Sequence, residues 1–170
     1  AIRRQQQAFA AAATPYYAAL IDPRDPGCPI RKQVVPSMAE FAACPGETGD
    51  PLAEERDMPV PGITHRYPDR VLLYVTHLCP VYCRHCNRRR KVARPASALS
   101  RDQIQSALKY IQHHREIRDV LISGGDPLCL SDAHLEQLLK KLRAIPHVEL
   151  LRIGTRAPVT LPQRVTPFLA

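Results

Sequence analysis

Tryptophan is absent from the 170-residue sequence, glycine occurs only 7 times, and no apolar run is long. A transmembrane helix needs roughly 20 consecutive apolar residues, so none is predicted. The alanine-rich start is interrupted by Gln5–Gln7 and lacks the long apolar part of a secretory signal. We therefore expect a cytoplasmic protein with no membrane partner.

The overall composition is that of a folded protein. Hydrophobic residues make up 45% of the chain, which excludes global disorder. The length is that of one domain able to bury its own core. The net charge is 24 − 16 = +8. A basic excess alone mostly reflects solubility, and we expect no nucleic-acid partner.

Proline divides the sequence into two parts. Ten of the 17 prolines lie between Pro15 and Pro68, where they interrupt any long helix or central strand. We predict that residues 1–69 form an irregular segment that packs on or caps the rest, with one short helix near 37–43. Residues 70–170 are predicted to form the regular part.

Strands and helices alternate after residue 70. Residues 71–76 and 120–123 are apolar runs typical of strands buried on both faces. Two helices with one apolar face each are predicted, one after Ser100 with Gln103 completing a capping box, the other after Ser131 or Asp132. A third strand is predicted at 148–153. This β-α-β-α-β order indicates an α/β fold with parallel strands.

Three polar segments follow the three predicted strands. They are residues 79–90, 124–126 and 154–156. Chemistry in parallel α/β sheets takes place at the carboxyl ends of the strands. We therefore expect these segments to form one active site.

Three of the six cysteines lie within eight residues, as Cys79-x3-Cys83-x2-Cys86. Such a cluster in a cytosolic chain indicates a metal site rather than disulfides. A four-iron cluster held by three thiolates keeps one iron open, whereas structural zinc takes four ligands. A zinc site completed by His77, His85 or Cys129 is the alternative. Cys28, Cys44 and Cys129 are interpreted as structural.

The cysteine spacing, directly after a buried strand, resembles the signature of radical S-adenosylmethionine (SAM) enzymes. Further motifs resemble the lysine 2,3-aminomutase family from about Thr14 to the end of the chain. The most specific are His65-Arg66-Tyr67-Pro68-Asp69-Arg70, Tyr82-Cys83-Arg84-His85-Cys86-Asn87-Arg88-Arg89-Arg90, Ser123-Gly124-Gly125-Asp126-Pro127 and Arg152-Ile153-Gly154-Thr155-Arg156.

The resemblance implies a fold and an activity. The fold is the start of a partial TIM-type radical SAM barrel. The activity is movement of the α-amino group of lysine to the β-carbon, through a 5′-deoxyadenosyl radical and a pyridoxal phosphate aldimine. The implied cofactors are a [4Fe–4S] cluster, SAM and pyridoxal 5′-phosphate. The implied partners are an amino-acid substrate, an electron donor such as a flavodoxin or ferredoxin, and further copies of the full-length chain.

The resemblance also implies residue roles. Cys79, Cys83 and Cys86 match the cluster ligands. Gly124, Gly125 and Asp126 match the motif that receives the amino group of SAM. Arg66 and Arg70 match the arginines that hold the pyridoxal phosphate group, and Arg88 matches the one that holds the substrate carboxylate. From the residues alone, a solvated surface charge or a salt bridge is the preferred interpretation of each arginine, and a helix or turn cap is the alternative for Asp126.

Several alternatives stay open at this stage. The substrate can be glutamate or arginine, and a relative that modifies a lysine for a translation factor has the same chemistry. A zinc- or cluster-binding module without catalysis is the alternative from another class. None of the chain's lysines matches the position that carries pyridoxal phosphate in the family, so we expect a fragment or a truncated product; they are Lys32, Lys91, Lys109, Lys140 and Lys141.

Overall fold

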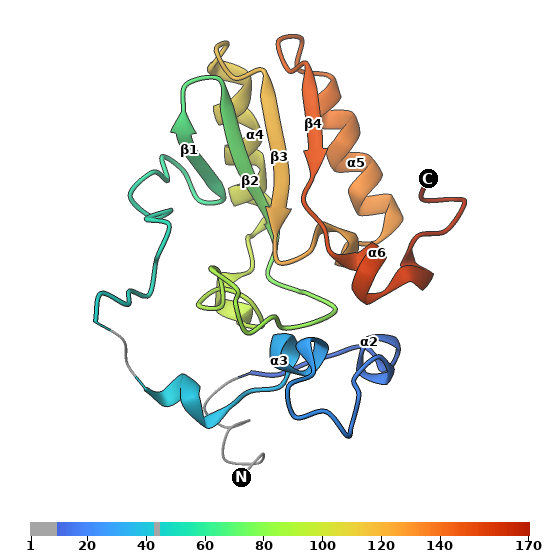
Figure 1. Ribbon diagram of the computed structural model, residues 1–170. Coiled ribbons are helices and arrows are strands. Elements are labelled where there is room, and N and C mark those ends of the chain that lie inside the picture. Colours follow the sequence, from blue (N-terminus) through green and yellow to red (C-terminus); the bar gives the residue numbers. More distant parts are fainter. Residues whose placement is uncertain (1–9, 43–44) are drawn as a thin grey trace.

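The computed structural model describes residues 10–42 and 45–170. A four-stranded sheet with the order β1-β2-β3-β4 forms its centre (Figure 1). The strands are β1 Ile63–Tyr67, β2 Arg70–Thr76, β3 Asp119–Gly124 and β4 Leu150–Ile153. β1 runs antiparallel to β2, whereas β2, β3 and β4 are parallel. The α/β prediction is confirmed at this level, and closure into a partial barrel stays a prediction.

Two helices connect the parallel strands, and both begin as the sequence predicts. α4 spans Arg101–His113, and its N-cap Ser100 forms the capping box with Gln103. α5 spans Asp132–Arg143 with Ser131 as its N-cap, so the cap is the serine of the two residues considered. Each side-chain cap satisfies a backbone N–H that has no partner within the helix.

The main core lies between the sheet and these two helices. Alternation along β2 turns Val71 and Leu73 to the helices, while Val120 and Ile122 do the same on β3. They pack against the apolar faces of α4 and α5, which include Ile111. The opposite face of β2 carries Arg70, Leu72, Tyr74 and Thr76. We call this the inner face. Helices α4 and α5 pack on the other face of the sheet.

The amino-terminal part is less irregular than predicted. It contains helix α2 at Pro15–Ala19, helix α3 at Pro29–Val34 and a 3₁₀ helix at Met38–Phe41, the last within the region predicted near 37–43. It also contains β1, a strand that the sequence reasoning missed. β1 pairs with β2 on the other side of the boundary placed at residues 69/70. Residue 43 and Cys44 lie outside the described residues.

The remaining elements of the structure are short. β4 begins at Leu150, two residues later than the predicted strand, because residues 146–149 form a turn in which Val148 N–H donates to the Ile145 carbonyl at 3.1 Å. A short helix, α6, spans Ala157–Thr160, and short 3₁₀ helices occupy Pro95–Ser97, Pro127–Cys129 and Pro162–Arg164. Within the described ranges, no helix has the length and apolarity needed to cross a bilayer.

We expect Ile122→Ala to lower the free energy of unfolding by about 2–5 kcal/mol, because this side chain is fully buried between sheet and helices. Urea unfolding followed by circular dichroism measures the change. The matched control is Leu150→Ala on β4, whose side chain is 48% exposed and should lose far less. Equal losses for the two variants would contradict the placement of the core.

Candidate functional site

The carboxyl ends of β2 and β3 meet through direct backbone contacts. The Gly125 N–H donates to the Thr76 carbonyl at 2.6 Å, and the Asp126 N–H donates to the Leu78 carbonyl at 2.7 Å. A Cβ atom on Gly125 would lie 2.2 Å from the Leu78 oxygen, and Gly124 has φ +135°. Only glycine fits both positions without rearrangement. These contacts fix the loop that carries the cysteines against the end of β3.

Cys79, Cys83 and Cys86 lie close enough together to affect one another. Burial, together with the smaller effects of the neighbouring Cys129, Asp126, Cys86 and Cys83, raises the pKa of Cys79 to about 12. Burial also raises the pKa of Cys86. The Cys86 Sγ accepts the Arg88 N–H at 3.3 Å, and the Cys83 Sγ accepts a hydrogen bond from the Arg156 guanidinium. The structure therefore brings the predicted ligands together in a positively charged, half-buried environment.

The donor set fits an iron–sulfur cluster. Three thiols of one loop are the ligand type and number that leave one iron of a four-iron cluster open. In the parts of the chain that the structure describes, no three His, Cys, Asp or Glu side chains converge on one metal ion. The zinc site completed by a fourth ligand stays the alternative.

Asp126 has a structural role in this geometry. It is 3% exposed, and its carboxylate accepts hydrogen bonds from the Leu128 N–H at 3.0 Å, the Thr155 hydroxyl at 2.6 Å and the Arg156 N–H at 2.8 Å. It caps the 3₁₀ helix at Pro127–Cys129. The carboxylate thus joins the ends of β3 and β4, as the turn-cap alternative predicted. Its contact with SAM stays a prediction.

Arg156 is a site residue that the sequence reasoning quoted in a motif without giving it a role. Besides Cys83, its guanidinium donates to Gln33 Oε1 at 2.9 Å and to the Tyr17 hydroxyl at 3.4 Å. Tyr17 belongs to α2 and Gln33 to α3. One side chain therefore connects the end of β4, a predicted cluster ligand and both amino-terminal helices. These side-chain contacts join residues more than 120 positions apart in the sequence, so no local pattern could show them.

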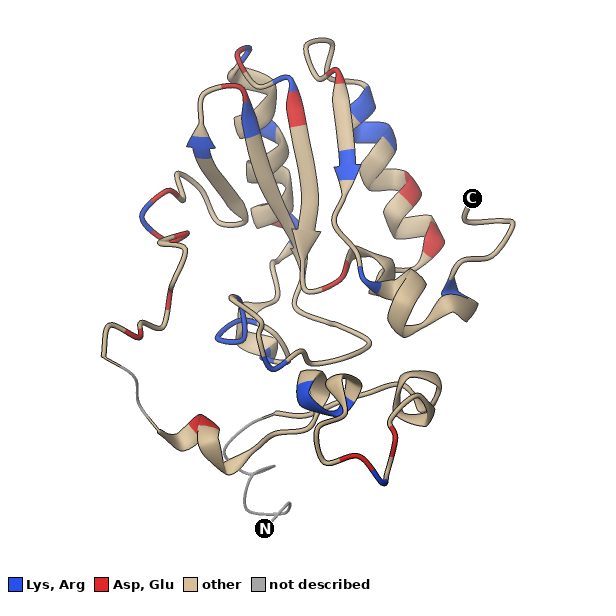
Figure 2. Cartoon of the chain, in the orientation of Figure 1, with Lys and Arg blue, Asp and Glu red and all other residues tan. Residues whose placement is uncertain are grey.

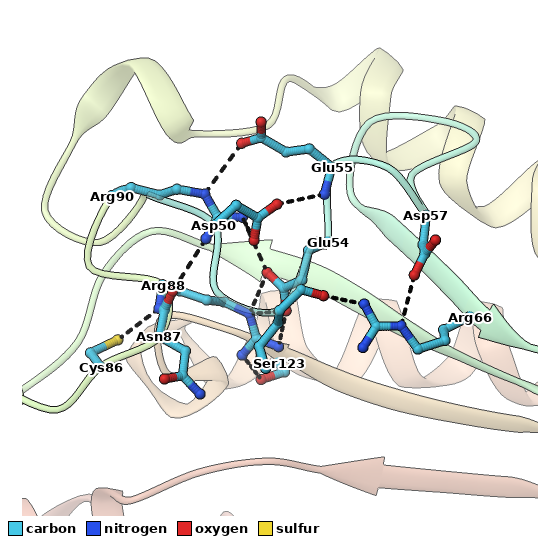
Figure 3. Close-up of polar contacts among 11 residues, drawn as sticks. Asp50, Glu54, Glu55, Asp57, Arg66, Cys86, Asn87, Arg88, Arg90 and Ser123 are labelled. Carbon is cyan, nitrogen blue, oxygen red and sulfur yellow. Dashed lines mark hydrogen bonds and ion pairs between the residues drawn. The ribbon is translucent and has the colours of Figure 1, made fainter. Parts of the chain in front are cut away.

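Arg88 forms a buried ion pair with Glu54. The Arg88 guanidinium contacts both carboxylate oxygens, with N–O distances of 2.6, 2.8 and 3.1 Å, and also reaches Ser123 Oγ at 3.5 Å (Figure 3). Glu54 is 4% exposed. The salt-bridge alternative for Arg88 is therefore present in the structure. The contact with Ser123 places Arg88 on the inner face at the end of β3.

The neighbouring arginines are also paired. Arg90 contacts Asp50 at 2.7 Å, and Arg66 contacts Asp57 at 2.7 Å and the Leu52 carbonyl. Residues 50–57, which we call the acidic segment, therefore receive arginines from both β1 and the cysteine loop. In Figure 2 the basic residues of that loop gather below the sheet.

Arg70 lies elsewhere. It begins β2, at the opposite end of the sheet from the cysteine loop, and pairs with Asp69 at 2.8 Å (Figure 2). The Arg70 guanidinium lowers the pKa of Asp69 to about 2. The structure thus joins Arg66 and Arg88 to one acidic segment but does not bring Arg70 to the cysteines. The roles of Arg66 and Arg70 toward a phosphate stay predictions.

Comparisons with known proteins show which family the chain is similar to. Residues 73–166 match the Radical SAM superfamily. The chain is 53% identical over 158 residues to L-lysine 2,3-aminomutase of Clostridium subterminale, covering 93% of this chain and 38% of that protein. The corresponding enzyme of Fusobacterium nucleatum is 54% identical, with 93% and 37% covered. Glutamate 2,3-aminomutase of Clostridioides difficile is 47% identical, with the same coverage of 93% and 37%.

The chain belongs to the radical SAM superfamily, since the match covers more than half of it and includes all three cysteines of the loop. Membership implies a [4Fe–4S] cluster and SAM, and the three thiols fit that cluster. The chain spans about two fifths of the length of these curated relatives.

We expect anaerobic reconstitution to load about four irons per chain, with three thiolates as protein ligands. Cys79→Ala, Cys83→Ala and Cys86→Ala should each abolish loading, measured as iron content and visible absorbance. The stringent control is Cys129→Ala, because Cys129 lies beside Cys79 in the same cavity and should still leave loading intact. Loss of iron in Cys129→Ala, or loading of one zinc instead, would contradict the three-thiolate assignment.

Proposed function

We propose that this chain is the cluster- and SAM-binding part of a radical SAM 2,3-aminomutase that acts on lysine. The observation that carries the proposal is the meeting of Cys79, Cys83 and Cys86 with the partly buried Arg88 at the carboxyl edge of a parallel sheet. Identity of 53% and 54% to two lysine 2,3-aminomutases over 93% of the chain supports the same reaction. The glutamate enzyme at 47% makes glutamate the second substrate to test.

The cysteine loop has the task of holding the cluster. Cys79, Cys83 and Cys86 would bind three irons and leave the fourth open for SAM. When bound and reduced, the cluster and SAM supply the radical that removes a hydrogen atom from the substrate. The backbone at Gly124 and Gly125 lies beside this loop, and the absence of side chains there allows a ligand to approach closely. A small electron-transfer protein such as a flavodoxin or ferredoxin would deliver the electron.

The arginines have the task of holding anions. Arg88 would bind the substrate carboxylate, since a guanidinium matches a carboxylate in a two-bonded fork. In the structure this fork is filled by Glu54, so the substrate must share or replace that partner. Arg66 and Arg70 would hold the phosphate of pyridoxal phosphate, which supplies the carbonyl that carries the substrate amine. Both guanidinium groups are partly exposed. Arg66 pairs with Asp57 and the Leu52 carbonyl, and Arg70 pairs with Asp69.

The cellular setting belongs to the same proposal. Cysteines that serve as ligands rather than disulfides are typical of a reducing compartment, which supports a cytoplasmic enzyme. The described cysteines are all free. We also propose that the enzyme assembles as a homo-oligomer and uses neither nucleic acid nor membrane as a partner.

Alanine variants of Arg66, Arg70 and Arg88 should have different defects in the protein that carries this sequence. We expect it to convert L-lysine to β-lysine anaerobically with SAM, pyridoxal phosphate and a reductant, as measured by chromatography. Arg66→Ala and Arg70→Ala should lower the pyridoxal phosphate content. Arg88→Ala should keep that content and raise KM for lysine by tens to hundreds of times, since a charged contact contributes about 2–3 kcal/mol.

The control is Arg115→Ala, a change at an exposed arginine after α4 that should alter neither quantity. Equal loss of pyridoxal phosphate in Arg88→Ala and Arg70→Ala would overturn the assignment. Conversion of L-glutamate in place of L-lysine would move the proposal to the glutamate enzyme.

A further inference from the structure

A cavity of about 280 Å³ opens on the inner face of the sheet beside the acidic segment. β1 and β2 form one wall through Thr64, Leu72 and Tyr74. Glu54 and Glu55 form a second wall, while Arg88 and Lys91 of the cysteine loop form a third. The residues that lead into α4 close the remaining side. The volume suits one small molecule such as an amino acid.

The hydroxyl of Tyr74 lacks a partner in this cavity. Tyr74 is 6% exposed, and its hydroxyl oxygen is buried without a hydrogen bond in the described part of the chain. Burial raises the pKa of Tyr74 to about 12, so the group remains a neutral donor at physiological pH. A buried hydroxyl left unpaired destabilises the folded protein. A ligand that accepts this hydrogen bond removes that destabilisation.

Lys91 differs from the other cations around it. Arg88 and Arg90 contact carboxylates directly, with shortest N–O distances of 2.6 and 2.7 Å. The Lys91 ammonium instead lies 5.8 Å from the centre of the Tyr74 ring. Burial lowers the pKa of Lys91, and Glu54, Glu55 and Asp50 attract its charge at longer range. Its charge is therefore available to a ligand in the same cavity as the Tyr74 hydroxyl.

From this juxtaposition we propose that Tyr74 and Lys91 bind the α-carboxylate of the amino-acid substrate, beside Arg88. One neutral donor and one ammonium on adjacent elements suit the two oxygens of a carboxylate. Glu54 holds the Arg88 guanidinium at the edge of the cavity and acts as its positioning residue. The inference rests on the proposed function, because it takes an amino acid as the ligand.

Two ligands separate a carboxylate site from a general effect on folding. L-Lysine carries the α-carboxylate, whereas 1,5-diaminopentane has the same chain and both amines without it. Calorimetric titration of the purified protein gives the dissociation constant for each ligand. We expect Tyr74→Phe to weaken L-lysine binding about five- to tenfold, because it removes one neutral hydrogen bond. Lys91→Met should weaken it about tenfold or more, because it removes a charged one. Neither change should alter the binding of 1,5-diaminopentane.

The matched controls are Tyr16→Phe and Lys109→Met, which alter exposed side chains on α2 and α4 and should leave both affinities unchanged. Thermal unfolding supplies a second readout. Tyr74→Phe without ligand should keep or raise the Tm, because it removes an unpaired buried hydroxyl. A fall of several degrees would mean that the hydroxyl already has a partner in the protein, and would overturn the proposal.

The remaining outcomes separate this inference from the proposed function. If the unaltered protein forms β-lysine but the two variants bind L-lysine normally, the inference fails and the function stands. If it forms no β-lysine but the variants lose L-lysine and keep 1,5-diaminopentane, the carboxylate site stands and the proposed reaction fails. Equal weakening of both ligands, or no binding of L-lysine by the unaltered protein, overturns the carboxylate site.

Discussion

The close contact between the backbone at the end of β3 and the loop after β2 is the constraint on which the site depends. Two short hydrogen bonds, from Gly125 to Thr76 and from Asp126 to Leu78, hold the cysteine loop to the sheet. They form only because no side chain stands between the two backbones. The Asp126 carboxylate then extends the connection to the end of β4. Three consecutive parallel strands thereby place their following loops at one edge, which parallel topology favours but does not by itself guarantee.

The second organising element is charge compensation on the inner face. The basic residues of the cysteine loop meet the acidic segment, where Arg88 and Arg90 both pair with the buried Glu54. A buried pair of this kind contributes modestly to net stability, because desolvation opposes the attraction, but removing one partner leaves an uncompensated charge. The pairing therefore fixes where the Arg88 guanidinium stands more than it strengthens the fold. An anion that enters beside it finds its donors already oriented.

The sequence reasoning predicted those features of the fold that depend on short stretches of the chain. Apolar runs indicated β2 and β3, and Ser100 with Gln103 indicated the start of α4. The cysteine spacing predicts the cluster ligands, and that assignment stays a prediction. The sequence reasoning missed β1 because Thr64, His65 and Arg66 are polar. The pairing of β1 with β2 also depends on the turn at Pro68 and Asp69. The ion pair between Arg88 and Glu54 was not predicted, because Glu54 lies 34 residues away in a segment without regular structure. Contacts of that separation depend on the folded sheet, which no window of sequence contains.

Arg156 connects the two amino-terminal helices to Cys83, a predicted cluster ligand. Its guanidinium is bonded at once to Cys83, to Gln33 of α3 and to Tyr17 of α2. A ligand that binds Cys83 only in the folded protein stabilises the folded protein by mass action. This stabilisation includes the contacts of Arg156 with Tyr17 and Gln33. If Cys83 binds the cluster as proposed, loading of the cluster and docking of α2 and α3 are linked equilibria. Each makes the other more favourable by the same free energy.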